Sequence, residues 1–276
     1  MLLRFAKMHG LGNDFMLVDL ISQSADLSAS QIRYLGDRST GVGFDQLLLV
    51  ETPQSPDVDF RYRIFNSNGA EVEHCGNGAR CFAKFVHDQH LTGKRNIALQ
   101  TSNGRIMLKM LKDQGVEVDM GVPVMQPDQV PFKAPTEAVS YSLKQDGQQY
   151  TMGVVSMGNP HAVLIVDDVA LAPVLELGAK LEHHPRFPNQ ANIGFMQIID
   201  RNTIKLRVFE RGVGETKACG TGACAAVVVG QQQGLLDAKV TTHLTGGDLS
   251  IEWQGPGQNL FMTGPTTHVY EGQIKL

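Results

Sequence analysis

Two short stretches, Cys75-Gly76-Asn77-Gly78-Ala79 and Cys219-Gly220-Thr221-Gly222-Ala223, decide the fold of this chain. They lie 219 − 75 = 144 residues apart. Three residues upstream of the first stretch recur upstream of the second at the same offset: Arg63 as Arg207, Phe65 as Phe209 and Glu71 as Glu215. Motifs that recur in one order at a constant spacing are typical of an internal repeat. The sequence therefore predicts a duplicated chain.

Further segments repeat in the same order at slightly different offsets. They are Gly12-Asn13 with Gly158-Asn159, residues 42–46 with residues 193–197, and Asn103-Gly104 with Gly246-Gly247. Insertions and deletions in loops between two copies would produce such a drift. Pro123, Pro127, Pro131 and Pro135 fall between the copies, and proline-rich segments are typical of linkers. We therefore interpret residues 121–136 as the linker.

Alternating and β-branched segments predict strands in both halves. They cover residues 15–20, 45–51, 59–66, 96–101 and 105–112, and then 161–166, 193–199, 203–210, 239–244 and 248–253. Helices are predicted over 79–90 and 223–233 after the two cysteine motifs, and over 28–37 and 169–182. Ser28 or Ser30 would cap the helix at 28–37. This pattern indicates two similar α+β domains, with a ligand expected between them.

Composition and charge narrow the class of protein. The 276 residues include 24 Lys and Arg against 28 Asp and Glu, a net charge of −4, and no basic run that would favour nucleic acid. Arg4 and Lys7 interrupt the only apolar stretch at the start, and the longest apolar runs are too short to span a membrane. We expect a cytoplasmic protein with no nucleic-acid or membrane partner, whose four cysteines stay reduced.

Each cysteine motif places a thiol before a glycine-rich helix start. Glycines let backbone N–H groups approach a ligand, and the positive end of a helix favours an anion and a thiolate. Two such motifs suggest an acid and a base on opposite faces of one carbon, an arrangement that inverts a stereocentre. Cys81 and Cys224, inside the helices, are expected to be buried apolar residues instead.

Two other uses of the cysteine motifs stay open. Zinc could be held by Cys75, Cys81, Cys219, Cys224 or His74, although no Cys-x₂₋₄-Cys pair is present. A phosphate could be bound by the glycines, although neither copy has the Gly-Lys-Ser/Thr of a phosphate loop. The spacing favours catalytic thiols and no metal.

Polar residues near the motifs suggest a zwitterionic ligand. Asparagine next to glycine is often a turn former, but Asn66 and Asn192 lie at the ends of apolar strands. Glu210-Arg211 offers opposite charges for an ammonium and a carboxylate, or forms a surface ion pair. His161 could assist proton transfer or be a core histidine.

At these residues the sequence resembles the diaminopimelate epimerase family over essentially its whole length. The resemblance is carried by Met8–Phe15, Gly43–Gln46, Cys75–Cys81, Gly158–His161, Glu210–Gly212 and Ala218–Ala223. It implies two pseudo-symmetric domains, each a curved, mostly antiparallel sheet around a central helix. The expected domains are 1–119 completed by a C-terminal strand at 265–276, and 120–264, with the active site in the cleft between them.

The resemblance also implies site residues and a reaction. Cys75 and Cys219 would be the two bases of a reaction that needs no pyridoxal phosphate or other cofactor, with His161 and Glu210 in support. Substrate contacts are expected from Asn13, Gln46, Asn66, Gly76, Asn77, Asn159, Asn192, Glu210, Arg211, Gly220 and Thr221. The implied reaction interconverts LL- and meso-diaminopimelate, in the biosynthesis of lysine and peptidoglycan precursors. Tyr270 would lie at a homodimer contact.

Thr221 departs from the family pattern, since many members have serine there, but it keeps a hydroxyl and an N–H group. Two rival functions stay open: an epimerase or racemase for another amino acid such as proline, and a non-catalytic amino-acid binding protein.

Overall fold

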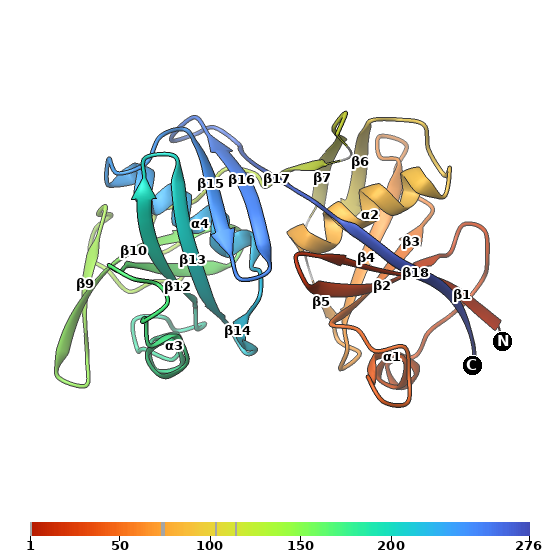
Figure 1. Ribbon diagram of the computed structural model, residues 1–276, viewed down its shortest axis with the longest axis horizontal. Helices are drawn as coiled ribbons and strands as arrows, with labels where there is room; N and C mark the ends of the chain where they lie inside the picture. Colours follow the sequence, from red (N-terminus) through yellow and green to blue (C-terminus); the bar gives the residue numbers. More distant parts are fainter. Residues whose placement is uncertain (1, 73–74, 103, 114) are drawn as a thin grey trace. The chain divides into compact units, whose positions relative to one another are not determined.

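The computed structural model describes the whole chain except residues 1, 73–74, 103 and 114. The chain divides into two compact units. Unit 1 comprises Met1–Asp119 and Thr263–Leu276, and unit 2 comprises Met120–Met262. Figure 1 follows the chain through both units, which are described separately below.

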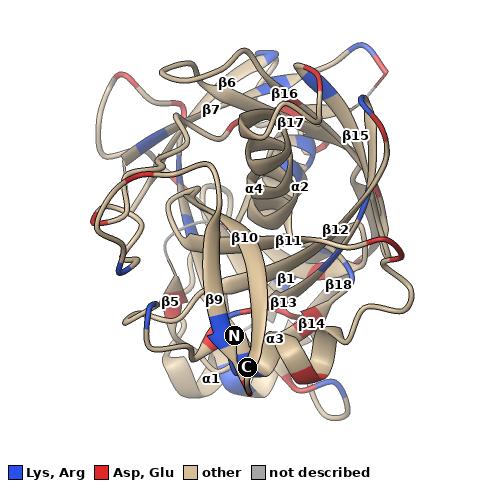
Figure 2. Ribbon diagram, turned by 90° about the vertical axis from the view of Figure 1, so that its left-hand side faces the viewer, with Lys and Arg blue, Asp and Glu red and all other residues tan. Residues whose placement is uncertain are grey.

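Unit 1 is a mostly antiparallel sheet with two helices. Its strands are β1 (Leu2–Gly10), β2 (Asn13–Asp19), β3 (Gln46–Glu51), β4 (Phe60–Asn66), β5 (Glu71–Val72), β6 (Asn96–Thr101), β7 (Gly104–Met110), β8 (Val116–Asp119) and β18 (Thr267–Lys275). The order across the sheet is β18-β1-β2-β3-β4-β6-β7-β8, parallel at β2–β3 and β4–β6. The N- and C-terminal strands are therefore neighbours, and the two ends of the chain lie close together in Figure 2.

Helix α2 (Gly76–Asp88) is the core helix of unit 1, and it packs on β1, β2, β3, β7 and β8. Its side chains are buried from Asn77 through Ala83 and again at Phe85 and Val86. The shorter α1 (Ala29–Gly36) covers a second core with β3, formed by Ile32, Leu35, Leu47 and Phe65 among others. Ser28 and Gln31 form the capping box of α1, which confirms the predicted cap at Ser28.

Unit 2 repeats this plan. Its strands are β9 (Tyr141–Gln145), β10 (Gln148–Ser156), β11 (Pro160–Ile165), β12 (Asn192–Asp200), β13 (Thr203–Glu210), β14 (Gly214–Thr216), β15 (Lys239–Leu244) and β16 (Gly247–Trp253), while β17 (Leu260–Gly264) crosses the boundary between the units. The order is β9-β10-β11-β12-β13-β15-β16, parallel at β11–β12 and β13–β15. The two helices are α3 (Val174–Glu182) and α4 (Gly220–Gln232).

Helix α4 carries no charged residue and is drawn without a coloured segment in Figure 2. It packs on β10, β11, β12, β13 and β16 and is buried along most of its length. Gly153 of β10 allows this close packing, because a Cβ atom there would lie 2.3 Å from Cγ1 of Val229. A sheet around a central helix thus occurs twice, and the predicted duplicated α+β fold is confirmed.

The duplication extends to equivalent side chains. Arg63 of β4 makes a two-point ion pair with Glu71, at 2.9 and 2.8 Å. Arg207 of β13 makes the same pair with Glu215, at 2.6 and 2.9 Å. In both units a glycine with positive φ lies in the turn before the first strand of a parallel pair: Gly12, at 83°, between β1 and β2, and Gly158, at 89°, between β10 and β11.

Three sequence-based expectations need correction. Leu47 faces Phe65 as Ile193 faces Phe209, so the sheet register equates the copies at an offset of 193 − 47 = 146. The proposed match of residues 42–46 with 193–197 is therefore wrong, because 42–45 form the loop before β3 whereas 193–197 lie within β12.

Helices α2 and α4 begin at Gly76 and Gly220, three residues before the predicted starts at 79 and 223. Helix α3 begins only at Val174 instead of residue 169, because the residue before a proline is disfavoured in a helix and Pro173 is the N-cap. No helix in the described part of the chain is long and apolar enough to cross a membrane.

Candidate functional site

Cys75 is the N-cap residue of α2, so its thiol lies at the positive end of that helix. Its sulfur accepts a hydrogen bond from the backbone N–H of Gly78, with an N···Sγ distance of 3.4 Å. The Tyr62 hydroxyl donates to the Cys75 carbonyl at 3.4 Å. Position 78 has to be glycine, because a Cβ atom there would lie 2.6 Å from the Tyr62 hydroxyl oxygen.

Two predicted asparagines lie beside Cys75. The Cys75 sulfur is 3.7 Å from Oδ1 of Asn13, which also accepts from Nδ2 of Asn77 at 3.3 Å. The buried Arg80 donates to Oδ1 of Asn77 at 2.9 Å. Asn13 in turn donates to Asp45 at 3.0 Å.

A second polar pair of unit 1 lies at the end of the neighbouring strands. Gln46 begins β3 directly opposite Asn66 at the end of β4, and it donates to the Asn66 side chain at 2.9 Å. Oε1 of Gln46 is buried and accepts no hydrogen bond from a described residue. Since Gln46 follows Asp45, this pair adjoins the Asn13 group.

A cluster of charged side chains includes Asp45, which accepts the hydrogen bond from Asn13. Arg38 pairs with Asp14 and Asp45, and Lys7 donates to Asp14 and to the Gly43 carbonyl. Burial would raise the pKa of Asp14, but the hydrogen bonds from Arg38 and Lys7 outweigh it and lower that pKa to about 2.

Cys219 is the N-cap residue of α4 and is more buried than Cys75. Its sulfur lies 3.6 Å from the Thr221 hydroxyl, and the Glu210 side chain is within hydrogen-bonding reach of it. Burial, followed by the negative charge of Glu210, raises the pKa of the Cys219 thiol well above its usual range. Cys219 is therefore a thiol with a carboxylate beside it.

His161 supports the Cys219 group through Asn159. Nε2 of His161 lies 3.0 Å from Oδ1 of Asn159, and Nδ2 of Asn159 donates to the Thr221 hydroxyl at 3.5 Å. Burial, followed by the charge of Arg211, lowers the pKa of His161 to about 3. His161 is therefore a neutral core histidine that is also hydrogen-bonded to the site.

Asn192, Glu210 and Arg211 meet at the ends of β12 and β13. Asn192 donates to the Pro160 carbonyl at 3.1 Å and accepts from the Arg211 backbone N–H at 3.0 Å. Glu210 accepts a short hydrogen bond from the Thr216 hydroxyl. The Arg211 guanidinium donates to the Asn189 carbonyl at 3.1 Å.

The predicted residues thus form one group in each unit. Unit 1 contributes Asn13, Gln46, Asn66, Cys75, Gly76 and Asn77, and unit 2 contributes Asn159, His161, Asn192, Glu210, Arg211, Cys219, Gly220 and Thr221. Tyr270 lies apart from these groups on β18, where it is half exposed and packs edge-on against Phe5. Cys81 and Cys224 are fully buried, as expected.

The structure bears on the zinc alternative through the state and the grouping of the candidate ligands. All four cysteines carry thiols instead of disulfide bonds. Among the described residues, no three or more His, Cys, Asp or Glu side chains are grouped to hold a metal ion. His74, one of the candidate zinc ligands, lies outside the described residues.

Arg80, Asp45, Tyr62 and Thr216 support the site but were given no role from the sequence. Arg80 stood within the first motif, yet nothing local indicates that an arginine in a helix will be fully buried. The hydrogen bonds of Asp45 and Thr216 join residues distant in the chain or across a turn, where no spacing rule applies.

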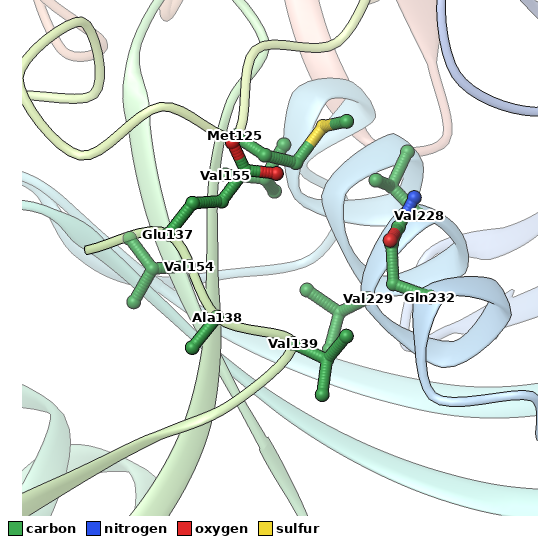
Figure 3. Close-up of a pocket in the computed structure, with 9 residues that line it drawn as sticks. All are labelled: Met125, Glu137, Ala138, Val139, Val154, Val155, Val228, Val229 and Gln232. Carbon is green, nitrogen blue, oxygen red and sulfur yellow. The ribbon is translucent and has the colours of Figure 1, made fainter.

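A separate pocket lies in unit 2 between β10, the second half of α4 and the loop before β9 (Figure 3). Its volume is about 240 Å³, and its lining is mainly valine, with Met125, Glu137 and Gln232 at its sides. It contains neither Cys219 nor another predicted site residue. It is therefore distinct from the candidate site.

Comparison with known proteins addresses the chain as a whole. The family model described as diaminopimelate epimerase matches residues 5–126 and 153–269. The diaminopimelate epimerase of Stutzerimonas stutzeri (strain A1501) is 61% identical over all 276 residues of both chains. That of Pseudomonas syringae pv. tomato is 59% identical, again over the full length of both.

Solved structures with low sequence identity share the fold. A hydroxyproline epimerase from Agrobacterium vitis superposes with a TM-score of 0.73 at 13% identity, covering 99% of this chain and 92% of that one. A Bacillus anthracis protein of the PhzF family reaches 0.69 at 14% identity over the whole of both chains. Full-length identity at this level and the matching family model place the chain: it belongs to the diaminopimelate epimerase family.

Proposed function

We propose that this chain interconverts LL- and meso-2,6-diaminopimelate, without pyridoxal phosphate or another cofactor, by moving a proton between two cysteines and the substrate α-carbon. As a family member, the chain is an isomerase. The observation that carries the mechanism is the duplicated placement of a thiol at a helix N-terminus, Cys75 on α2 and Cys219 on α4.

In this mechanism the two half-sites act on opposite faces of one α-carbon. One cysteine removes the α-proton as a thiolate, and the other, as a thiol, donates a proton from the opposite face. After the reaction their protonation states are exchanged, so the reverse reaction can follow. Burial and then the negative charge of Glu210 raise the pKa of the Cys219 thiol, which suits Cys219 to start as the proton donor.

Stabilising the carbanion is the hard step, because no cofactor would delocalise its charge. The N-termini of α2 and α4 would supply backbone N–H groups from Gly76, Asn77, Gly220 and Thr221 to the α-carboxylate. Each tenfold gain in rate needs about 1.4 kcal/mol, so several such donors have to act together in a site from which water is excluded. Closure of the two domains over the substrate would provide that exclusion.

Recognition of the substrate rests on the remaining polar groups. Diaminopimelate carries an amino acid group at each end, and the far end needs both a cation and acceptors. Arg211 supplies a positive charge, and Asn13, Gln46, Asn66, Asn159 and Asn192 supply amides. Oε1 of Gln46, which accepts no bond from a described residue, is suited to accept from a substrate ammonium.

Exchange of solvent deuterium into the α-position of LL-diaminopimelate tests the proposal. We expect one deuterium at the inverted centre of the product, and no inversion in Cys75→Ala or Cys219→Ala, because each variant keeps only one of the two bases. Proline or hydroxyproline epimerised in preference to diaminopimelate would favour the first rival. Binding without exchange or inversion would favour a binding protein.

We also propose that the active enzyme is a cytoplasmic homodimer with Tyr270 in the contact. The half-exposed Tyr270 lies on β18, an exposed edge strand of unit 1. Mass measured by light scattering should correspond to two chains and fall toward one chain in Tyr270→Glu. A reducing compartment suits a mechanism that depends on thiols.

A further inference from the structure

A chain of hydrogen bonds connects the buried Arg80 to Cys75 through two asparagines. Nη2 of Arg80 donates to Asn77 at 2.9 Å, Asn77 donates to Oδ1 of Asn13 at 3.3 Å, and the Cys75 sulfur lies 3.7 Å from that same oxygen. Arg80 is completely buried. A buried guanidinium is expensive, so its position at the end of this chain calls for a reason.

The chemistry at both ends determines which way each amide faces. A guanidinium can only donate hydrogen bonds, and a carboxylate can only accept them. Arg80 therefore requires the oxygen of Asn77 on its side, and Asp45, which accepts from Nδ2 of Asn13 at 3.0 Å, requires the nitrogen of Asn13 on its side. Neither amide can be reversed without losing a bond. An acceptor oxygen must face the Cys75 sulfur.

We propose that Arg80 is a positioning residue for Cys75, whose buried guanidinium orients the amides of Asn77 and Asn13 so that Oδ1 of Asn13 faces the catalytic sulfur. The Cys75 thiol then donates to a fixed oxygen, while the N–H of Gly78 is directed at the same sulfur. The thiol form of Cys75 can donate to Oδ1 of Asn13, and the thiolate form can accept from the N–H of Gly78. A residue that alternates between acid and base needs a partner for each form. The inference rests on the proposed catalytic role of Cys75.

Unit 2 has no arginine at the position equivalent to Arg80, and its chain of hydrogen bonds toward the cysteine begins at another residue. The position equivalent to Arg80 in α4 is 80 + 144 = 224, a cysteine, and the position equivalent to Phe15 of β2 is 15 + 146 = 161, a histidine. The chain of bonds in unit 2 starts at His161 and passes through Asn159 to the Thr221 hydroxyl. That hydroxyl accepts from Asn159 and lies 3.6 Å from the Cys219 sulfur, where either atom can be the donor. The two cysteines thus face different groups, an amide oxygen at Cys75 and a hydroxyl at Cys219.

Among the residues that the structure describes, which do not include residues 73–74, the other titratable groups near Cys75 do not take the place of Arg80. Burial raises the pKa of Tyr62 on β4 and of Cys81 on α2, so both are neutral. Asp45 acts on Cys75 through Asn13 and is paired with Arg38, and Lys7 and Asp14 lie behind it.

The test compares Arg80→Lys with Arg80→Gln. Lysine keeps the charge and can only donate, whereas the glutamine amide is neutral and can present either of its ends. Arg63→Lys and Arg63→Gln are matched controls, since Arg63 is in the same unit but pairs with Glu71 and Glu51 instead. The readout is the rate of iodoacetamide alkylation at Cys75, located by mass spectrometry, without substrate and across about pH 6 to 9.

An oxygen that accepts from the thiol favours its protonated form, so freeing the two amides to reverse in Arg80→Gln should speed alkylation of Cys75 about tenfold at neutral pH and move its profile to lower pH. Arg80→Lys should stay within about threefold of the unaltered protein, and kcat should fall more in Arg80→Gln than in Arg80→Lys, with KM little changed. Equal profiles for the two variants, or the same change in Arg63→Gln, would overturn the proposal. A residue that only fills space would change the melting temperature and leave the profile alone.

If Arg80→Gln does not fold, Asn77→Ala gives the same information. It removes the amide that connects Arg80 to Asn13 without adding a charge, so alkylation of Cys75 should change in the same direction, and an unchanged rate would contradict the proposal. Because alkylation is measured without substrate, its outcome is independent of deuterium exchange. The positioning role of Arg80 can therefore fail while the proposed reaction is confirmed, and the proposed reaction can fail while the positioning role is confirmed.

Discussion

At the scale of single residues, the two cysteines have the same backbone position but different surroundings. Each is the N-cap of a buried helix. Cys75 is partly exposed and faces an amide oxygen, whereas Cys219 is buried between a hydroxyl and a carboxylate. The proposed reaction needs one thiolate and one thiol at each turnover, and the different surroundings bear on which cysteine is protonated before substrate binds.

Gly222, the third residue of α4, is expected to control the position of the Cys219 sulfur. A Cβ atom at Gly222 would lie 3.2 Å from that sulfur and 2.9 Å from Val208. Gly222→Ala should therefore displace the thiol by a few tenths of an ångström and lower kcat about tenfold, since a misplacement near 1 Å costs about a hundredfold.

Gly230→Ala is the control, because a Cβ atom there would lie 2.3 Å from Leu236 at the other end of the same helix. It should lower the melting temperature but leave the kcat of the folded enzyme nearly unchanged. Equal kcat values for the two variants would show that the sulfur position is not critical.

The buried His161 predicts a specific loss of stability in mild acid. Its pKa is lowered to about 3 in the folded protein, by burial and then by Arg211, whereas an unfolded histidine titrates near 6.5. Only the unfolded chain gains a proton between these values, so this contribution to stability is complete above about pH 6.5 and is lost as the pH falls.

Urea unfolding at pH 8 and pH 5 measures the effect. From the higher to the lower pH, the free energy of unfolding should fall by about 2 kcal/mol more in the unaltered protein than in His161→Gln, which cannot titrate. Parallel pH dependence in the two proteins would mean that His161 takes up a proton in the folded state.

At the scale of secondary structure elements, the equivalent strands β4 and β13 carry equivalent arginine–glutamate ion pairs, and the arginine of β13 makes an additional hydrogen bond. Arg207 pairs with Glu215 as Arg63 pairs with Glu71, but Arg207 also donates to the carbonyl of Val169 at 3.0 Å. That bond holds the segment leading into α3. Arg207→Met should therefore speed amide hydrogen exchange in residues 169–175 by about tenfold, as measured by mass spectrometry.

Arg63→Met removes the matching ion pair from unit 1 and serves as the control. It should leave exchange in residues 169–175 unchanged. If Arg207→Met also leaves that segment unchanged, the carbonyl contacts do not hold it.

Elements with a local signal could be predicted from the sequence, and those that depend on distant partners could not. The apolar β3, β4, β12 and β13 were expected within one or two residues. β1 was missed because Arg4 and Lys7 interrupt its apolar pattern, and Lys7 is buried only by virtue of Asp14 and the Gly43 carbonyl. β18 has no apolar alternation, and its return to β1 was expected from the family resemblance alone.

The same limit applies to the site. The cysteine motifs and the asparagines carry a local signature, so the sequence could identify them. Arg80 lies inside the first motif, but its role depends on Asn13 from β2 and on Asp45 from the loop before β3. Only the folded sheet brings these residues together.

At the scale of the whole molecule, the duplication has produced two groups of predicted site residues. They differ in the buried residue from which the hydrogen bonds toward the cysteine begin. Unit 1 uses Arg80 and has Phe15 where unit 2 has His161, and unit 2 has Cys224 where unit 1 has Arg80. A site assembled from two copies can vary each half independently while both helices keep a cysteine at their start. In the proposed mechanism, the duplicated fold would supply two equivalent helix N-termini for a carboxylate and two differently surrounded cysteines for proton transfer.

Sensitivity to oxidation is the prediction that tests the two halves together. If both sulfurs flank one α-carbon, each lies within about 3 to 4 Å of it, and without substrate they could approach the roughly 2.05 Å of a disulfide. A mild oxidant should inactivate the enzyme by linking Cys75 to Cys219, and a dithiol should restore activity. Cys81 and Cys224 are fully buried, so replacing both with alanine should leave this behaviour intact. Peptide mapping that finds Cys81 or Cys224 in the bridge, or finds no bridge after inactivation, would refute a reaction in which the two motif cysteines face each other across the substrate.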